Sequence, residues 1–396
     1  MAARCWSSFL HCFFDYETPK TIVIYNKGVG SIFRFIQFLI IAYVIGYVCL
    51  VQKGYQETEA VISSATTKVK GYAATNTSAL GLHVWDVTEY VIPPQGDDSF
   101  FVLTNIIPTP GQIQQACPEV PHPSSICESD DDCSEGRSPL QGNGVQTGRC
   151  VNYSASVKTC QVLAWCPHED DSNLPKPALL LKAENFTVMI KNSVRYPKFG
   201  FSNFPSLRKN ILANVSKGYL KTCRYHSTTD PHCPIFRLGD MVHEAGADFP
   251  TMAEKGGVMA ILIDWSCDLD WPEKDCVPKY SFVRMDKSTH NTAPGFNFRF
   301  AKYSNNGSIQ SRTLIKGFGI RFDVIVFGTA GKFSVLLTVV NLGAALSFLS
   351  LVGAVCDWVL VTCTAKKDFY TKHKTSYLTE EGTGEVISFG KSYGTS

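Results

Sequence analysis

The chain has 396 residues, of which 44% are hydrophobic and only 18% are charged. Its formal net charge of +2 excludes the strongly basic balance expected of a nucleic-acid-binding protein. The low charged fraction instead favours a protein with segments that cross a membrane.

Two long apolar runs, one near each end, have the length of membrane-spanning helices. After a short N-terminal segment, residues 1–30, the first span is predicted at 31–53 and the second at 333–359. The second has no charged residue from Phe333 to Cys356, which as a helix covers about 36 Å of a bilayer core roughly 30 Å thick. A signal peptide would be shorter than the first run. Two buried core helices are the alternative, which the length of the runs together with their apolar character on all sides disfavours.

The charges that flank the spans predict the topology. Lys and Arg precede the first span and follow the second, which favours cytosolic placement of both termini, residues 1–30 and the tail 360–396. Residues 54–332 then form a domain of a multi-pass membrane protein that lies outside the cell or in a lumen. Five N-x-S/T acceptors for glycosylation agree, since all lie between the spans: Asn76, Asn152, Asn185, Asn214 and Asn306.

Ten of the 15 cysteines also lie between the spans. They are Cys117, Cys127, Cys133, Cys150, Cys160, Cys166, Cys223, Cys233, Cys267 and Cys276. An even number with no C-x-x-C pair predicts five disulfides rather than a metal site. Six of them fall within 117–166, which we expect to be a compact cross-linked lobe with little regular structure.

The extracellular segment has mainly the pattern of β-strands. Short runs rich in Val, Ile, Phe and Thr alternate with Gly, Pro and Asn, which predicts a mostly antiparallel β-domain. The best helical candidate is residues 238–257. The fold class is therefore two transmembrane helices flanking a large, disulfide-rich, mostly antiparallel β ectodomain.

Cationic side chains recur on strand-like runs. Lys68 and Lys70 alternate on one run, and Asn297 and Arg299 alternate with phenylalanines in "FNFRF". Lys316 lies on a third run. A solvated surface explains any one pair, but the set suits a polyphosphate, which several cations can surround.

An ecto-nucleotidase could share two spans and a disulfide-rich ectodomain. It would need a glycine-rich phosphate loop and a base, and "GTAGKF" at 328–333 lacks the first Gly and the Ser or Thr of a P-loop. The histidines show no metal-ligand spacing. We therefore expect no catalytic residues, no metal site and no enzyme activity.

Several stretches together resemble one known family over about residues 14–377. They are "KGYQ" (53–56), "TKVKG" (67–71), "WDVTEYV" (85–91), "GRCV" (148–151), "AENFT" (183–187), "DPHCPIFRLG" (230–239), "PGFNFRFAKY" (294–303) and "GIRFDVIVFGTAGKF" (319–333). They and the order of the ten cysteines are similar to the P2X receptors, trimeric cation channels gated by extracellular ATP.

The resemblance implies roles for individual residues. Lys68, Lys70, Asn297, Arg299 and Lys316 match phosphate-binding positions, and Thr187 matches the adenine-reading position, with the first two lysines and Thr187 facing the others across a subunit boundary. It also implies the disulfides Cys117–Cys166, Cys127–Cys150, Cys133–Cys160, Cys223–Cys233 and Cys267–Cys276.

The resemblance further implies a pore along the second span. The matching gate positions are Val340, Asn341, Ala344 and Ser347, and Asp357 near the cytosolic end would favour cations. The family's proline near the start of this span is absent here. A polar contact between packed helices is the alternative role of Asn341.

We therefore expect a non-selective channel for Na⁺, K⁺ and Ca²⁺, opened by ATP with or without Mg²⁺ and needing no cofactor. The expected partners are ATP, membrane lipid and copies of the chain in a homotrimer, or related subunits in a heterotrimer, with no nucleic acid. An acid-sensing or epithelial-type sodium channel is the second alternative, because it shares two spans and a cysteine-rich ectodomain.

Overall fold

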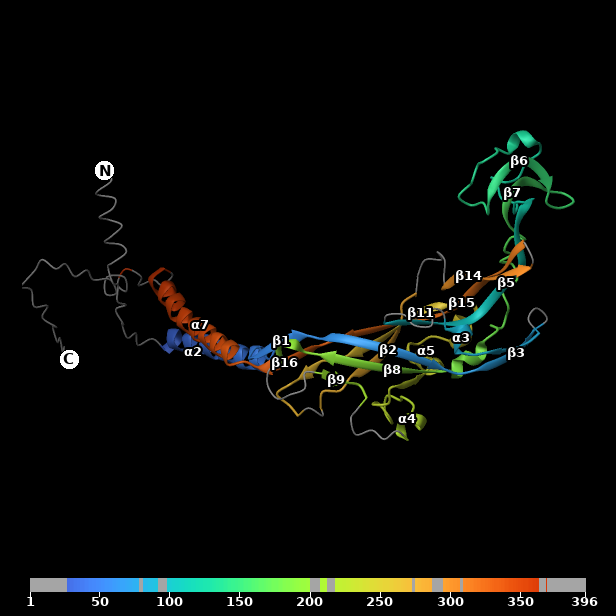
Figure 1. Cartoon of the computed structure of the whole chain (residues 1–396). Coiled ribbons are helices and arrows are strands. Elements are labelled where there is room, and N and C mark those ends of the chain that lie inside the picture. The colour runs from blue at the N-terminus through green and yellow to red at the C-terminus, as the bar shows by residue number, and fades with distance from the viewer. Residues whose placement is uncertain are drawn as a thin grey trace, which may run out of the picture. The chain divides into compact units, whose positions relative to one another are not determined.

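The computed structural model describes residues 27–77, 81–91, 98–199, 207–211, 218–272, 275–286, 295–306, 309–362 and 368. The chain divides into two compact units (Figure 1). One comprises residues 1–57 and 333–396, and the other comprises residues 58–332.

The first unit contains the two membrane helices. Helix α2 (Lys27–Ala42) continues into the π-helical segment η1 (Tyr43–Val51), and α7 spans Val335–Thr362. Gly30–Val51 and Val335–Val359 are both long and apolar enough to cross a bilayer. Their large apolar side chains are mostly exposed in the single chain, as expected of surfaces that meet lipid or other helices.

The second unit is built from β-sheets. The largest has the order β13-β11-β15-β5-β7-β6, with β14 paired to β15. These strands are β5 (Ser99–Pro118), β6 (Val145–Asn152), β7 (Lys158–Cys166), β11 (Gly257–Asp264), β13 (Lys279–Arg284), β14 (Asn297–Asn306) and β15 (Ile309–Phe327).

A second sheet has the order β10-β8-β2, with β9 paired to β8. Its strands are β2 (Ile62–Lys70), β8 (Thr187–Arg195), β9 (Leu207–Lys209) and β10 (Ile235–Arg237). Smaller sheets are β1 (Gln56–Ala60), β16 (Thr329–Phe333) and β12 (Cys267–Asp268), and the hairpin β3 (Ala73–Thr77) with β4 (Gly81–Trp85). One core contains buried side chains from both large sheets.

Short helices complete this unit: α3 (Val87–Tyr90), α4 (Tyr219–Thr222), α5 (Leu238–Glu244), α6 (Phe249–Lys255), η2 (Asp130–Asp132), η3 (Leu181–Asn185) and η4 (Pro197–Phe199). The single helical stretch expected at 238–257 is thus two helices. Gly246 between them has φ +70°, and Asp248 caps α6 by accepting a hydrogen bond from the Thr251 amide.

The mostly antiparallel pattern is confirmed, with β11–β15 and β12–β16 as parallel exceptions. The prediction of little regular structure at 117–166 was wrong. β6 and β7 lie in this lobe, and β7 also pairs with the end of β5, so strand pairing and disulfides act together. The disulfides join the pairs that the resemblance implies: Cys117–Cys166, Cys127–Cys150, Cys133–Cys160, Cys223–Cys233 and Cys267–Cys276.

Candidate functional site

The first group of candidate residues lies at the end of β2 and the start of β8. Lys68 and Lys70 are exposed on β2, whereas Val69 between them is buried. Lys70 lies directly opposite Thr187 in the antiparallel register. Among the described residues, neither lysine forms an ion pair, so both ammonium groups are available to an anion. We call Lys68, Lys70 and Thr187 the first half-site.

Packing beneath β2 determines where this half-site ends. Gly71 follows Lys70 with φ +157°, and a Cβ there would lie 2.2 Å from the Phe186 ring. The Tyr90 hydroxyl donates a hydrogen bond of 2.9 Å to the Gly71 carbonyl, and the Tyr90 and Phe186 rings pack with centroids 4.7 Å apart. A glycine is therefore required for the chain to turn over these rings.

The second group lies on β14 and β15. Asn297 and Arg299 are exposed, while Phe298 and Phe300 stack with centroids 5.7 Å apart and pack against the core. Arg299 lies opposite Lys316, whose residue is only 8% exposed. Asn297, Arg299 and Lys316 form the second half-site, with its polar side chains on the face opposite the phenylalanines.

Two carboxylates already contact the cations of the second half-site. Glu169 accepts hydrogen bonds from Arg299 Nε at 2.6 Å and Nη2 at 3.0 Å, and its Oε1 lies 3.3 Å from Lys316 Nζ. Asp171 Oδ2 lies 2.5 Å from the same Nζ. A phosphate would need the same positions, so Glu169 and Asp171 form an acidic clamp over the second half-site.

Charge and hydrogen bonding in the clamp alter two pKa values. Burial alone would raise the pKa of Asp171, but hydrogen bonds to Glu169 and Lys316 and the charges of Lys316 and Arg299 hold it below its usual value. Hydrogen bonds to Glu169 raise the pKa of Arg299. Both shifts favour the charged forms of Asp171 and Arg299, which strengthens the clamp.

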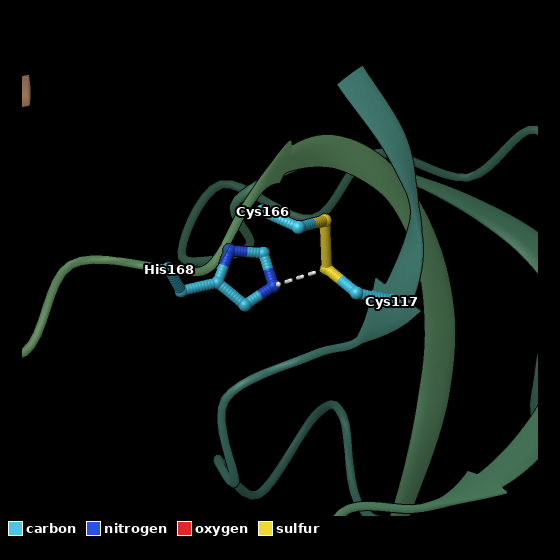
Figure 2. A group of neighbouring side chains, drawn as sticks. All are labelled: Cys117, Cys166 and His168. Atoms are coloured by element: carbon cyan, nitrogen blue, oxygen red, sulfur yellow. Dashed lines mark hydrogen bonds between the residues drawn. A yellow bond between two sulfur atoms is a disulfide. The ribbon is translucent and has the colours of Figure 1, made fainter. Parts of the chain in front are cut away.

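The segment that carries the clamp is anchored in the cysteine-rich lobe. The His168 ring lies against the Cys117–Cys166 disulfide, with Nε2 3.3 Å from Cys117 Sγ (Figure 2). The same nitrogen lies 3.1 Å from the Pro118 carbonyl oxygen. Glu119 lies next to this ring, with its Oε1 3.9 Å from Nε2. His168 immediately precedes Glu169, so these contacts determine where the clamp begins.

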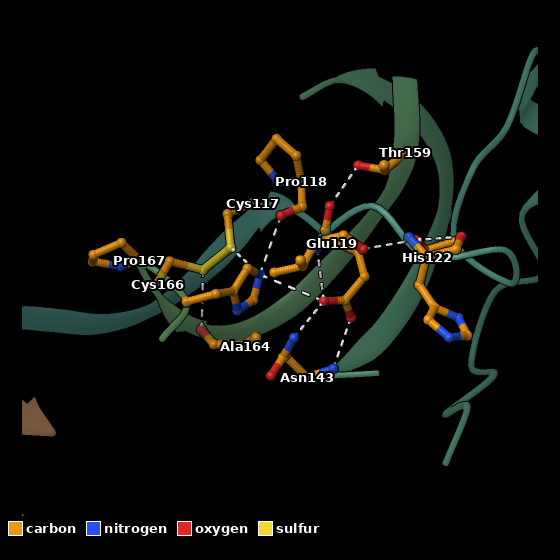
Figure 3. A network of polar contacts seen from close by, with 12 residues as sticks. Cys117, Pro118, Glu119, His122, Asn143, Thr159, Ala164, Cys166 and Pro167 are labelled. Atoms are coloured by element: carbon orange, nitrogen blue, oxygen red, sulfur yellow. Dashed lines mark hydrogen bonds and ion pairs between the residues drawn. A yellow bond between two sulfur atoms is a disulfide. The ribbon is translucent and has the colours of Figure 1, made fainter. Parts of the chain in front are cut away.

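Glu119 is a buried carboxylate with a full set of donors (Figure 3). It accepts hydrogen bonds from the Val120 amide and from both the amide and side chain of Asn143, at 2.7–2.9 Å. Its backbone carbonyl accepts one from Thr159 Oγ1 at 2.8 Å. A buried charge is stable only with such partners, so this network rigidifies the base of the lobe.

The structure does not bring the two half-sites together. One lies on the β10-β8-β2 sheet and the other on β14 and β15, and no hydrogen bond or ion pair within the described chain joins their side chains. Sequence reasoning missed Glu169 and Asp171. The acidic run after Cys166 was a signal, but nothing in the sequence indicates that this run reaches strands 130 to 145 residues further along.

The candidate pore residues lie on α7. Val340, Ala344 and Ser347 are exposed in the single chain and, at i, i+4 and i+7, share one helical stripe. Asn341 instead donates from Nδ2 to the Gly54 carbonyl at 2.7 Å. Asp357 is exposed near the C-terminal end of α7.

Other predicted sites can also be placed. Asn76, Asn152 and Asn185 are exposed, as glycan acceptors must be. Asn214 and the side chain of Asn306 lie outside the described residues. Each cluster of potential metal ligands found among the described residues includes disulfide-bonded cysteines, whose sulfurs are not free thiolates. Cys49 and Cys356, in the membrane helices, are free.

Comparison with known proteins identifies close relatives. A family model described as "ATP P2X receptor" matches residues 14–377. P2X purinoceptor 4 of Mus musculus is 48% identical over 385 residues, covering 96% of this chain and 98% of the relative. P2X purinoceptor 2 of Rattus norvegicus is 47% identical over 378 residues, covering 94% and 77%.

Solved structures of P2X receptors are also similar to this chain. The Gulf Coast tick P2X receptor, crystallised with ATP and Zn²⁺, is 40% identical with a TM-score of 0.75, covering 83% of this chain and 99% of that one. The chicken ATP-gated P2X7 receptor channel, crystallised with the competitive antagonist TNP-ATP, is 40% identical with a TM-score of 0.73, covering 84% and 100%.

Proposed function

This chain belongs to the P2X receptor family, and from that premise we propose that it is a subunit of an extracellular ATP-gated, non-selective cation channel in the plasma membrane. It is a ligand-gated channel subunit rather than an enzyme. The family matches favour this function over an ecto-nucleotidase and over an acid-sensing or epithelial-type sodium channel. ATP, free or with Mg²⁺, is the agonist, and Na⁺, K⁺ and Ca²⁺ are the permeant ions.

The separation of the two half-sites is the observation that supports the location of the ATP site. Lys68 and Lys70 present ammonium groups beside the Thr187 hydroxyl on one sheet, and Arg299 and Lys316 present cations on another. Neither half-site alone surrounds a triphosphate. Two subunits of a trimer, each supplying a different half, would complete the site, with the adenine near Thr187.

The ammonium groups and the guanidinium would bind the phosphates as charge-assisted partners, with the Asn297 amide as a further donor. In the second half-site the phosphates must replace the carboxylates of Glu169 and Asp171. ATP binding thus exchanges one set of anionic partners for another, which frees the acidic run and the lobe that carries it to move.

Three copies of α7 would line the pore. In that arrangement the exposed stripe of Val340, Ala344 and Ser347 faces the axis, and Asp357 adds negative charge near the cytosolic end. The contact of Asn341 with Gly54 holds the start of the ectodomain to α7 within one subunit. Both termini are cytosolic in this topology, and heterotrimers with related subunits would use the same half-sites.

The test measures whole-cell current in cells that express this chain. Lys70→Ala and Arg299→Ala should each raise the half-maximal ATP concentration by about 10- to 100-fold, because one charge-assisted contact is worth roughly 1.5–3 kcal/mol. Surface labelling provides the expression control. Unchanged sensitivity in both variants at normal surface level would refute the assignment.

Co-expression tests whether the site lies between subunits. A trimer that mixes Lys70→Ala and Arg299→Ala subunits has at least one boundary where an intact Lys70 faces an intact Arg299, so high-affinity current should partly return. The matched control pairs Lys70→Ala with Lys68→Ala, which damage the same half-site and leave no intact boundary of that kind. Equal recovery in both mixtures would contradict a shared site.

A further inference from the structure

A separate pocket lies between β10, α5 and β13. Its volume is about 280 Å³, and its floor consists of the buried side chains of Phe236, Met241 and Phe282. Tyr225 forms one wall, with its ring centroid 4.8 Å from that of Phe236 and 6.0 Å from that of Phe282. The pocket is therefore aromatic at its base and open at its rim.

The rim carries more negative than positive charge. Arg237 is its only guanidinium, and it is already bound: Nη1 lies 2.8 Å from Asp240 and Nη2 lies 3.1 Å from Glu184. Glu244 also lines the pocket, and within the described chain its carboxylate has no hydrogen bond or ion pair. One unbalanced negative charge therefore remains above the aromatic floor.

The other polar groups of the rim do not supply a compensating positive charge. His226 Nδ1 accepts a hydrogen bond from the Thr228 amide at 3.3 Å and lies 3.0 Å from the Thr228 hydroxyl, so this nitrogen is engaged within its own turn. His243 is exposed to solvent. Burial and the charge of Glu244 raise the pKa of Tyr225, which keeps its hydroxyl neutral.

We propose that this pocket binds a flat aromatic cation. The aromatic ring of the ligand would lie on Phe236 and Phe282 beside Tyr225, and its positive charge would face Glu244. The polyphosphate of ATP has the wrong charge for this rim, so the site is distinct from both half-sites. Arg237 nevertheless pairs with Thr187 across β10 and β8, which places the pocket one strand away from the first half-site.

N-methylquinolinium is a suitable probe because it is flat, permanently cationic and fluorescent, and quinoline is its neutral counterpart at pH 7.4. Equilibrium dialysis against the purified full-length protein in detergent should show the cation binding about fivefold more tightly than quinoline. Saturating ATP should leave this binding in place.

Variants locate the binding. Glu244→Gln should abolish the preference for the cation, whereas Glu244→Asp, which retains the charge, should keep most of it. Ser227→Trp, at the exposed rim, should reduce the binding of both probes. Glu128→Gln, on the exposed surface of the cysteine-rich lobe, is the matched control and should behave like the wild type, and size-exclusion chromatography checks that every variant is folded.

Three results would overturn the proposal. One is equal affinity for the two probes, or no binding, in the wild type. A second is wild-type binding in both Glu244→Gln and Ser227→Trp, which would place the cation elsewhere, for example in the pore. A third is loss of binding in Ser227→Trp with no effect of Glu244→Gln, which would reject a cation as the ligand class.

Discussion

Neutralising Glu169 should make the channel more sensitive to ATP. The carboxylate occupies both donors that Arg299 would offer to a phosphate, at 2.6 and 3.0 Å, and also lies 3.3 Å from Lys316 Nζ. In Glu169→Gln the side chain keeps its size but loses its charge, so ATP would no longer displace an ionised competitor. We therefore expect the concentration–response curve to move to lower ATP concentration.

The magnitude follows from the exposure of the two side chains. Arg299 is 50% exposed and Glu169 only 13%, so solvent screens the pair partly. Ion pairs at exposed sites contribute about 0.2–1 kcal/mol, and the two-point geometry places this pair near the upper end. A change of about 1 kcal/mol corresponds to a roughly fivefold lower half-maximal ATP concentration.

The assay is whole-cell current at graded ATP concentrations, with surface labelling to equalise expression. Glu128→Gln removes a carboxylate at the surface of the lobe and should leave the curve in place. In an Arg299→Ala background, Glu169→Gln should have a smaller effect, because the two hydrogen bonds from Arg299 are gone and only the contact of Glu169 with Lys316 remains. An unchanged or less sensitive Glu169→Gln channel, or equal effects in both backgrounds, would refute the reasoning.

Other outcomes follow from the same structure. The pKa of the Asp171 carboxyl is held below its ordinary value of 3.8, so its contact with Lys316 is present above that pH and is lost only on further acidification. The ratio of wild-type to Asp171→Asn sensitivity to ATP should therefore stay constant from pH 7.4 to 5.5 in current recordings, and a ratio that moves toward one at pH 5.5 would contradict this. Gly256→Ala should prevent surface expression, measured by biotinylation, because at φ +82° its Cβ would lie 2.2 and 2.4 Å from two carbonyl oxygens; normal trafficking would contradict this. A cysteine at Ser347 should react with an external water-soluble thiol reagent faster with ATP than without it, whereas one at Leu346 should react slowly in both states; equal rates would argue against the proposed pore stripe.

Local patterns in the sequence were sufficient to predict much of the fold. Long uncharged runs identify the membrane helices, because no charge is tolerated in the bilayer core without cost. Period-two alternation in "FNFRF" predicts a strand with Asn297 and Arg299 on one face, and the structure has them exposed on β14 with Phe298 and Phe300 toward the core. The even set of ten cysteines predicts five disulfides, which the structure contains.

Such local patterns do not predict which distant segments of the chain contact one another. Composition made 117–166 look irregular, yet β7 pairs with both β5 and β6, because strand pairing depends on partners far along the chain. The sequence likewise contains the acidic run after Cys166 without indicating its target.

The sequence by itself determined which residues could bind an anion, since residue type decides the charge of a side chain and alternation decides the face of the strand on which it lies. Only the tertiary structure decided how they are grouped. It places Lys70 and Thr187 as neighbours on one sheet and Arg299 and Lys316 as neighbours on another, through strand registers that link residues over a hundred positions apart in the first case. It also places the Glu169 carboxylate against the Arg299 guanidinium, because the contacts of His168 and Glu119 anchor the acidic run at the base of the lobe.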